Sequence, residues 1–185
     1  MKVAFIGTHG VGKTALTYRL AGRLKARDVS LEVVVEVARR CPLPLNESTT
    51  LAAQSWILHT QVADELVAAS RYPVVLCDRS VIDNYVYLLV AHGPQPALEP
   101  LVETWGRTYD LLVHVPMLCD TALQSDGVRS PNPAFQTTIE ERLRQELARR
   151  GIAAVELDSS SRGSWLETAE RAVLDVLKPP QLELL

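Results

Sequence analysis

The first strand-like segment of the chain runs directly into a glycine-rich loop, and no other feature restricts the possible folds as much. Residues 2–6 read KVAFI, and residues 7–14 read GTHGVGKT, which matches the pattern G-x-x-x-x-G-K-[ST]. Leucines then recur every four residues over 14–27, which predicts a helix. A loop between a strand and a helix N-terminus directs its backbone N–H groups at an anion. The segment therefore predicts a phosphate-binding P-loop.

The residues of this loop predict what it binds. Its glycines leave the space that a phosphate group occupies, Lys13 reaches the β- and γ-phosphates, and the Thr14 hydroxyl ligates Mg²⁺. An Asn-Lys-x-Asp segment, which would read guanine, does not occur in the sequence. We therefore expect ATP and Mg²⁺ as cofactors, and a local structural role for the His9 ring. The expected nucleotide contacts in the loop are Gly7, Thr8, His9, Gly10, Val11, Gly12, Lys13 and Thr14.

The rest of the chain alternates between strand-like and helix-like patterns. Apolar strand-like runs span 2–6, 29–37, 73–78, 110–115 and 152–158. Apolar residues with helical spacing occur over 14–27, 50–69 and 134–149, whereas the Pro-rich pieces at 41–44 and 94–100 indicate loops. This alternation predicts an α/β, three-layer P-loop NTPase fold with a five-stranded, mostly parallel sheet and helices on both faces. We expect a single domain over residues 1–185, with a lid segment near 120–150.

The overall composition limits the kinds of partner. The 185 residues carry a formal net charge of −3, which provides no basic surface field, so nucleic acid is not favoured as a partner. No apolar stretch approaches the roughly 18 residues that span a bilayer, so we expect no membrane association. The three cysteines, at positions 41, 77 and 119, form no ligand pair and fit reduced thiols. These features predict a cytoplasmic protein.

Charged residues follow the second and third strand-like runs, at the edge where open α/β sheets bind ligands. Glu36 could accept the proton of an attacking hydroxyl, and Asp78 could hold Mg²⁺ directly or through water. Arg79 could clamp a phosphate group, or it could form a supporting ion pair with a neighbouring aspartate. Asp83 is a candidate substrate contact, but its spacing from Ser80 equally fits a helix cap.

Further arginines lie near the expected nucleotide site. Residues 126–133 read DGVRSPNP, where Gly127 permits a hinge and Arg129 could move onto the phosphates as the site closes. Arg162 follows the fifth strand-like run, where it could stack on adenine or remain solvated. Four arginines of the last long helical run are expected to pair with glutamates one turn away on an exposed face. They are Arg142, Arg144, Arg149 and Arg150.

Several of these segments together resemble one family. GTHGVGKT, EVARR, VLCDRSVIDNYVY and DGVR are similar to segments of the small AAA-type P-loop proteins related to the kinase domain of the bifunctional nicotinamide-mononucleotide adenylyltransferase/ribosylnicotinamide kinase. They are more distantly similar to those of deoxynucleoside and thymidylate kinases. The resemblance implies ATP-dependent phosphoryl transfer to a nucleoside-like hydroxyl, with roles for Glu36, Asp78 and Arg79. It also implies that Gln61, or less favourably Gln54, contacts the base of the acceptor.

The sequence leaves two other functions open. The first is a regulatory ATP-binding switch, in which nucleotide and Mg²⁺ control a partner protein and phosphate passes only to water. The second is a kinase of polynucleotide 5′-hydroxyl groups, which the acidic balance disfavours. In our preferred reading the partners are ATP and a small-molecule phosphate acceptor that is a ribosylnicotinamide, a nucleoside or a nucleotide. The oligomeric state does not follow from the sequence.

Overall fold

The sheet that carries the site is formed by parallel strands. The computed structural model describes residues 1–45, 49–118 and 132–177, and within these residues five strands lie in the order β2-β3-β1-β4-β5. Every neighbouring pair is parallel, so the carboxyl ends of all five strands meet at one edge. The strands are β1 (Lys2–Ile6), β2 (Leu31–Val34), β3 (Val74–Asp78), β4 (Leu111–His114) and β5 (Val155–Glu156).

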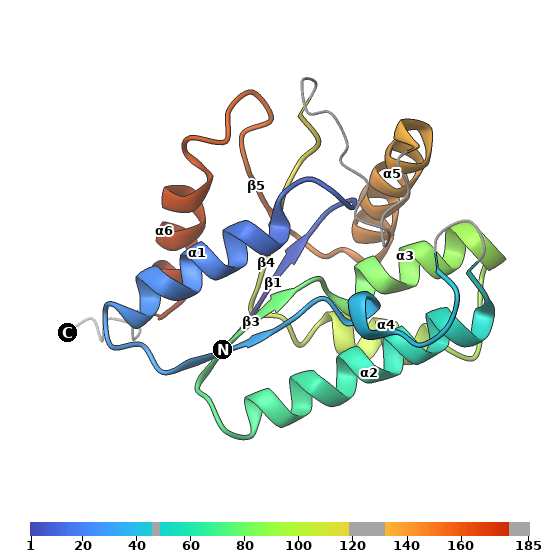
Figure 1. Cartoon of the computed structure of the whole chain (residues 1–185), viewed down its shortest axis with the longest axis horizontal. Helices are drawn as coiled ribbons and strands as arrows, with labels where there is room; N and C mark the ends of the chain where they lie inside the picture. The colour runs from blue at the N-terminus through green and yellow to red at the C-terminus, as the bar shows by residue number, and fades with distance from the viewer. Residues whose placement is uncertain (46–48, 119–131, 178–185) are drawn as a thin grey trace, which may run out of the picture.

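Helices cover both faces of this sheet and complete a three-layer α/β fold, as predicted (Figure 1). On one face α1 (Lys13–Lys25) packs beside α6 (Trp165–Leu177). The other face is covered by α2 (Leu51–Ala69), α3 (Val81–His92), α4 (Glu99–Gly106) and α5 (Pro133–Arg150). A short 3-10 helix, η1 (Val37–Arg40), follows β2. None of the described helices is both long and apolar enough to cross a membrane.

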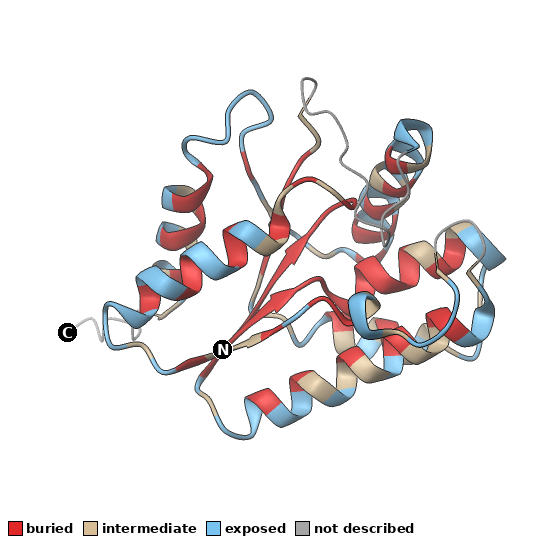
Figure 2. Cartoon of the chain, in the orientation of Figure 1, coloured by how far each residue is buried: buried red, intermediate tan, exposed pale blue. Residues whose placement is uncertain are grey.

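The central strand β1 explains why this layering is stable. All five of its residues are buried, and Figure 2 shows that β1 and β3 are among the most continuously buried segments. Val3 and Phe5 pack under α1 and α6, while Ala4 and Ile6 pack under the helices of the opposite face. A strand that is apolar at every position requires cover on both sides, because successive side chains point to opposite faces.

Three segments differ from the predicted boundaries. The second strand was expected over 29–37 but ends at Val34, because the chain turns into η1 at Glu36. The fifth was expected over 152–158 but pairs only through Val155–Glu156, since it is an edge strand with one neighbour. The Pro-rich piece at 94–100 was expected to be a loop throughout, yet α4 begins at Glu99 with proline in its first turn, where proline costs no hydrogen bond.

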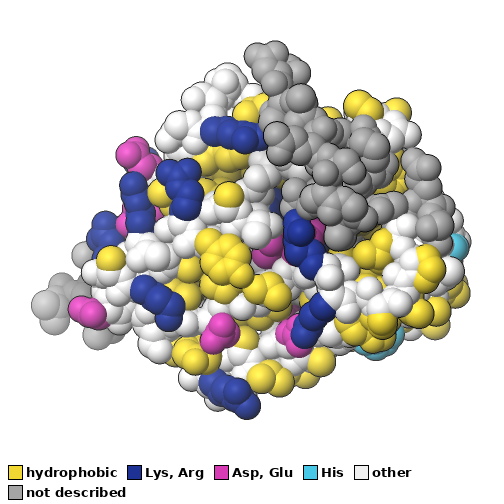
Figure 3. Space-filling view, viewed as in Figure 1, with side chains coloured by type: hydrophobic (Ala, Val, Ile, Leu, Met, Phe, Trp, Pro, Cys, Tyr) yellow, Lys and Arg dark blue, Asp and Glu magenta, His cyan; other side chains and the backbone are white. Residues whose placement is uncertain are grey.

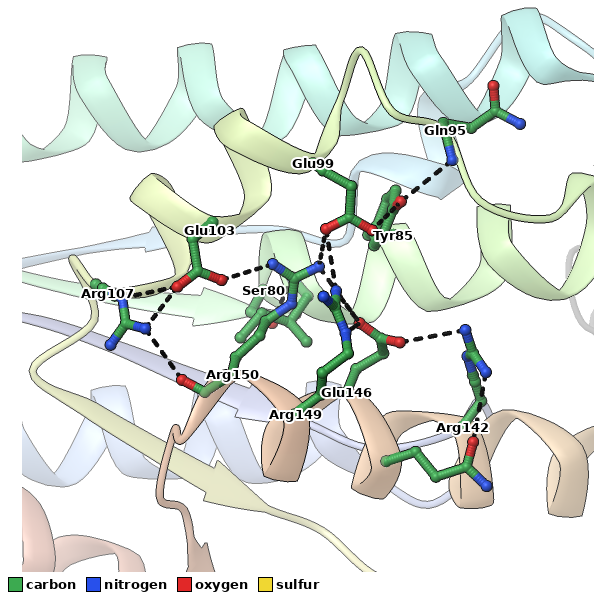
Figure 4. A network of polar contacts seen from close by, with 12 residues as sticks. Ser80, Tyr85, Gln95, Glu99, Glu103, Arg107, Arg142, Glu146, Arg149 and Arg150 are labelled. Carbon is green, nitrogen blue, oxygen red and sulfur yellow. Dashed lines mark hydrogen bonds and ion pairs between the residues drawn. The ribbon is translucent and has the colours of Figure 1, made fainter.

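The arginines of α5 were expected on an exposed face, and for Arg150 this is wrong. Its side chain is only 1% exposed and donates to Glu99 and Glu103 of α4, at 2.8 and 2.9 Å, as well as lying 3.3 Å from Glu146. Figure 4 shows this network joining α4 to α5. Arg144 does pair with Glu140 one turn away, as predicted.

Candidate active site

The P-loop occupies the turn between β1 and α1, and its backbone requires glycine. Gly7 has φ 137°, and a Cβ atom there would lie 2.5 Å from the carbonyl oxygen of Val115. Gly12 has φ 103° and is the N-cap of α1, so no side chain caps the first N–H groups of that helix. Glycine in this position leaves those N–H groups available to an anion. The loop therefore has the geometry of a phosphate cradle.

Lys13 lies at the start of α1 with its ammonium group turned into the loop. Its Nζ donates to the carbonyl oxygens of Gly7 at 2.8 Å and Thr8 at 2.5 Å. Burial, with help from the nearby Arg79, lowers the pKa of Lys13 to about 8, although three carboxylates oppose the shift. The ammonium group is thus held where phosphate oxygens would approach the loop, and its charge is easily lost at alkaline pH.

Thr14 and Asp78 meet at the carboxyl edge of the sheet. The Thr14 hydroxyl donates to Oδ2 of Asp78 at 2.6 Å, whereas Oδ1 of Asp78 is buried and has no partner among the described residues. An orphaned carboxylate oxygen beside a hydroxyl fits Mg²⁺, which one or two protein oxygens hold together with phosphates and water. The described residues contain no group of three or more His, Cys, Asp or Glu side chains suited to a metal.

A buried ion pair between Glu36 and Arg79 lies next to the loop. Nε of Arg79 donates to Oε1 of Glu36 at 2.7 Å, and Nε of Arg39 donates to Oε2 of Glu36 at 2.9 Å. Burial alone would raise the pKa of Glu36, but Arg79, Lys13 and Arg39 outweigh it and lower that pKa to about 2. Glu36 is therefore ionised throughout the physiological range.

Arg79 has an unusual backbone. Its φ of 100° lies in a region that non-glycine residues rarely adopt. Interactions with Tyr87 and with the carboxylates of Glu36 and Asp83 outweigh burial and raise the pKa of Arg79, so its guanidinium stays charged although only 5% of the residue is exposed. Strain of this kind persists only where the surroundings impose it, and it occurs preferentially at functional sites.

Asp83 connects the P-loop to α3. Its Oδ1 accepts from the backbone N–H of Gly7 at 3.0 Å, and its Oδ2 accepts from the N–H and hydroxyl of Ser80 at 3.1 and 2.8 Å. Together with Ser80 it forms the predicted capping box of α3. Burial raises the pKa of Asp83, and Asp83 is not among the residues that line the neighbouring cavity. The geometry favours the helix-cap alternative over the substrate contact that was also predicted.

A cavity of about 390 Å³ opens beside the ion pair. Glu36 and Arg79 line one part of it, and α2, α3 and α5 supply further side chains. The polar ones include Gln54 and Asn84, and the aromatic ones include Tyr87 and Phe135, whose ring centroids are 6.1 Å apart. A cavity of this size and mixed lining suits a small organic molecule.

The two glutamines of α2 occupy different places. Gln54 lines the cavity, with its Nε2 donating to the Thr49 hydroxyl at 2.9 Å. Gln61, which was the preferred base contact, is not a lining residue; its Nε2 donates to Glu65 at 2.8 Å and to the Arg79 carbonyl at 3.3 Å. Gln54 rather than Gln61 thus lines the cavity, and a contact of either glutamine with the base of an acceptor stays a prediction.

His9 has the local structural role that we expected, with partners that the sequence does not reveal. Its backbone N–H and its Nδ1 both contact the Tyr87 hydroxyl, at 3.1 and 3.0 Å, and its carbonyl accepts from Gln136 Nε2 at 2.6 Å. The P-loop is thereby held to α3 and α5. Helical spacing directs at most one of Tyr85 and Tyr87 toward an acceptor pocket without identifying which, and the only signal for Gln136 is its spacing after Pro133.

The two loop arginines are placed unequally by the structure. Arg162 is exposed, and its guanidinium lies over the Trp165 ring, 5.5 Å from the centroid. Its contact with adenine stays a prediction. Arg129, and with it most of the loop part of the expected lid near 120–150, lies outside the described residues.

Comparisons with known proteins agree with this geometry. A family model described as an AAA domain matches residues 2–167. Deoxyadenosine kinase from M. mycoides, solved with dCMP and dCDP, has a TM-score of 0.67 and 15% identity, over 96% of this chain and 98% of that one. NadR protein, solved with NR, has a TM-score of 0.71 and 22% identity, over 95% of this chain and 51% of that one, so the chain spans about half of NadR. No curated protein sequence matches.

Proposed function

The chain belongs to the AAA domain family, and from this premise we propose that it is an ATP- and Mg²⁺-dependent kinase that phosphorylates a hydroxyl group of a nucleoside-like small molecule. One observation carries the proposal: the Glu36–Arg79 ion pair lines a cavity that adjoins the P-loop and suits a small acceptor. The similar structures support the same proposal, since one is a deoxyadenosine kinase and the other is NadR protein in complex with NR.

In this proposal the nucleotide is bound by the loop. The amides at the start of α1 and the Lys13 ammonium group hold the β- and γ-phosphates, and Thr14 with Asp78 would hold the metal. A Mg²⁺ ion held by these two residues would neutralise part of the phosphate charge. Asp83 keeps Gly7, and with it the loop, at a fixed distance from α3.

Glu36 and Arg79 act on the transfer itself. Arg79 carries a permanent positive charge beside the loop, where it can stabilise the charge on the transferred group. With a pKa of about 2, Glu36 is a weak base but a strong hydrogen-bond acceptor. Phosphoryl transfer passes through a loose transition state in which positioning matters more than proton abstraction. We therefore assign Glu36 to orienting the acceptor hydroxyl toward the γ-phosphate.

The cavity favours a nucleoside over a nucleotide. Among its described lining residues Arg79 is the one lysine or arginine, and this side chain is already paired with Glu36. A monophosphate entering beside Glu36 would bring a second anion against that carboxylate, which is unfavourable in a buried site. We therefore expect the acceptor to be a nucleoside that carries no phosphate group.

The surface is less suited to a polynucleotide acceptor. On the face shown in Figure 3, lysine and arginine side chains lie scattered among acidic and hydrophobic ones rather than in a continuous basic track. A strand of nucleic acid is bound mainly through phosphate contacts to such a track. The remaining alternative, a regulatory ATP-binding switch, is distinguished from a kinase by the following experiment.

The test is a measurement of ADP release from MgATP with a panel of candidate acceptors. The panel contains ribosylnicotinamide, deoxynucleosides, nucleoside monophosphates and a 5′-hydroxyl oligonucleotide. We expect stimulation by a nucleoside and a phosphorylated product detectable by mass spectrometry. Lys13→Ala is the matched control and should show no release with any acceptor. Slow release that only a partner protein stimulates would instead identify the switch, and the proposal of a small-molecule kinase would be abandoned.

A further inference from the structure

Asn84 brings to the cavity a neutral amide group whose buried NH₂ nitrogen has no hydrogen-bond partner among the described residues. Asn84 is the fourth residue of α3 and lines the cavity, yet it is only 4% exposed. Asparagine is a poor helix former, and a buried amide without a partner destabilises a fold. This residue therefore costs stability where a leucine would not.

Neighbouring polar groups show that the surroundings could have satisfied an amide. Gln54, on the same cavity, donates to the Thr49 hydroxyl, and Gln136 donates to the His9 carbonyl. Asp83, the residue before Asn84, accepts three hydrogen bonds. Other unpartnered atoms nearby, Oδ1 of Asp78 and Nη1 of Arg79, belong to charged groups assigned above to the metal and the transferred phosphate. The Asn84 amide has no such role, and native proteins leave few buried polar atoms unpaired, so it indicates a group kept for a ligand.

We propose that the side-chain amide of Asn84 selects the acceptor by pairing with an amide-like edge of its base, in which a hydrogen-bond donor adjoins an acceptor. This inference rests on the proposed kinase function and assigns specificity to the same cavity. A neutral amide offers one carbonyl and one NH₂ group, so it matches a base that presents both. Suitable edges are the carboxamide of ribosylnicotinamide, the 4-amino and N3 groups of cytosine, and the 6-amino and N1 groups of adenine.

The placement of Asn84 fits this role. Asn84, Tyr87 and Ala91 all line the cavity, at the spacing of one helix face, while Glu36 and Arg79 line it from the ends of the neighbouring strands. A nucleoside whose hydroxyl contacts Glu36 extends its base into the part of the cavity formed by α3. The Tyr87 and Phe135 rings add apolar surface for a flat ring. Hydrogen bonds from Asn84 would then select one base, which stacking on the aromatic rings alone does not.

The test compares Asn84→Leu with the wild type. Leucine has nearly the same volume and no hydrogen-bonding group. With the best acceptor of the panel we expect the KM to rise about tenfold or more, with kcat changed far less, because a paired group is lost from binding. The melting temperature should stay equal or rise, since an unpaired amide has been removed. Gln145→Leu, which removes an exposed amide from α5, is the control and should change neither value.

A second variant and a second substrate pair sharpen the result. Asn84→Asp keeps the shape and polarity but loses the donor, so it should raise the KM as Asn84→Leu does. The wild type should prefer ribosylnicotinamide to its carboxylate analogue, which lacks the donor, and the panel identifies whether a carboxamide or an aminated base is the natural edge.

Two failures are distinguishable. An unchanged KM together with a lowered melting temperature in Asn84→Leu would make Asn84 a structural residue and overturn this inference, while the kinase assignment stood. Failure of every acceptor with the wild-type protein would overturn the kinase assignment and this inference with it.

Discussion

Single residues in this site are charged groups removed from water. Lys13, Glu36 and Arg79 are each buried, and they compensate one another across a short distance at the carboxyl edge of the sheet. The pKa values of Lys13 and Glu36 both fall, for different reasons. That of Lys13 falls because burial and Arg79 disfavour its positive charge, whereas that of Glu36 falls because the surrounding cations outweigh burial and favour its negative charge. The site is therefore electrostatically prepared for an incoming polyanion.

The lowered pKa of Lys13 predicts that ATP binding takes up a proton at alkaline pH. Below pH 8 the free protein already carries the ammonium charge, whereas above a pKa of about 8 a growing fraction is neutral. Phosphate charges favour the ammonium form, so ATP binding restores the proton and its affinity falls as the pH rises past 8. Isothermal titration calorimetry at pH 8.5 or so, in buffers of different ionisation enthalpy, measures this uptake. A heat independent of the buffer would contradict it.

Glu36→Gln should retain ATP binding and lose phosphoryl transfer. The amide still accepts a hydrogen bond from Arg79 but orients a hydroxyl less strongly, so kcat should fall on the order of 100-fold or more. The measurement is acceptor-stimulated ADP release at saturating ATP, with ATP affinity determined separately. Glu167→Gln, on the exposed surface of α6, is the control. Transfer at the wild-type rate would remove Glu36 from the mechanism.

Individual elements differ in how far the sequence predicts them. The P-loop, the buried strands and the capping box of α3 follow from local patterns, because each depends on residues that are neighbours in the chain. Which face of a helix reaches the cavity does not, since it depends on packing between α2, α3 and α5. Asn84 therefore appears in the site only with the structure, which also places Gln54 rather than Gln61 on the cavity. The expectation for Arg150 failed for the same reason.

At this scale Asp83→Ala should affect both stability and nucleotide binding. The variant loses the capping box of α3 and the hydrogen bond to Gly7, and we expect its free energy of unfolding to fall by about 2 kcal/mol. Because Gly7 opens the P-loop, ATP affinity should fall as well. Urea denaturation and calorimetry measure the two effects.

The matched control for Asp83 is Thr50→Ala, which removes the N-cap of α2. It should lose about 1 kcal/mol of stability with ATP affinity unchanged. Equal ATP affinity in both variants would show that Asp83 acts only as a cap.

On one face of the sheet, a network of contacts around Arg150 of α5 joins this helix to α4 and α3. This buried guanidinium contacts Glu99 and Glu103 of α4 and Glu146 of its own helix, and its cation lies over the Tyr85 ring of α3. Charged groups are costly to bury singly, so the arrangement is stable only when complete.

Arg150→Ala should therefore destabilise the fold without changing the chemistry. Removing the cation leaves the buried Glu146 with only the partly exposed Arg142 and Arg149 as partners, whereas Glu99 and Glu103 are themselves partly exposed and lose less. We expect the free energy of unfolding to fall by about 2 kcal/mol. Urea denaturation measures this loss, and kcat at a temperature where the variant stays folded should equal that of the wild type. Arg171→Ala on the exposed side of α6 is the control.

The Tyr87 hydroxyl contacts His9 of the P-loop, while the Tyr87 side chain lines the neighbouring cavity. An acceptor that displaces the Tyr87 ring as it enters the cavity would also displace the P-loop, and a nucleotide that displaces the P-loop would also change the cavity. Thermodynamic linkage makes such an influence reciprocal, so each substrate changes the dissociation constant of the other by the same factor. In the proposed kinase the nucleotide and the acceptor would therefore not bind independently.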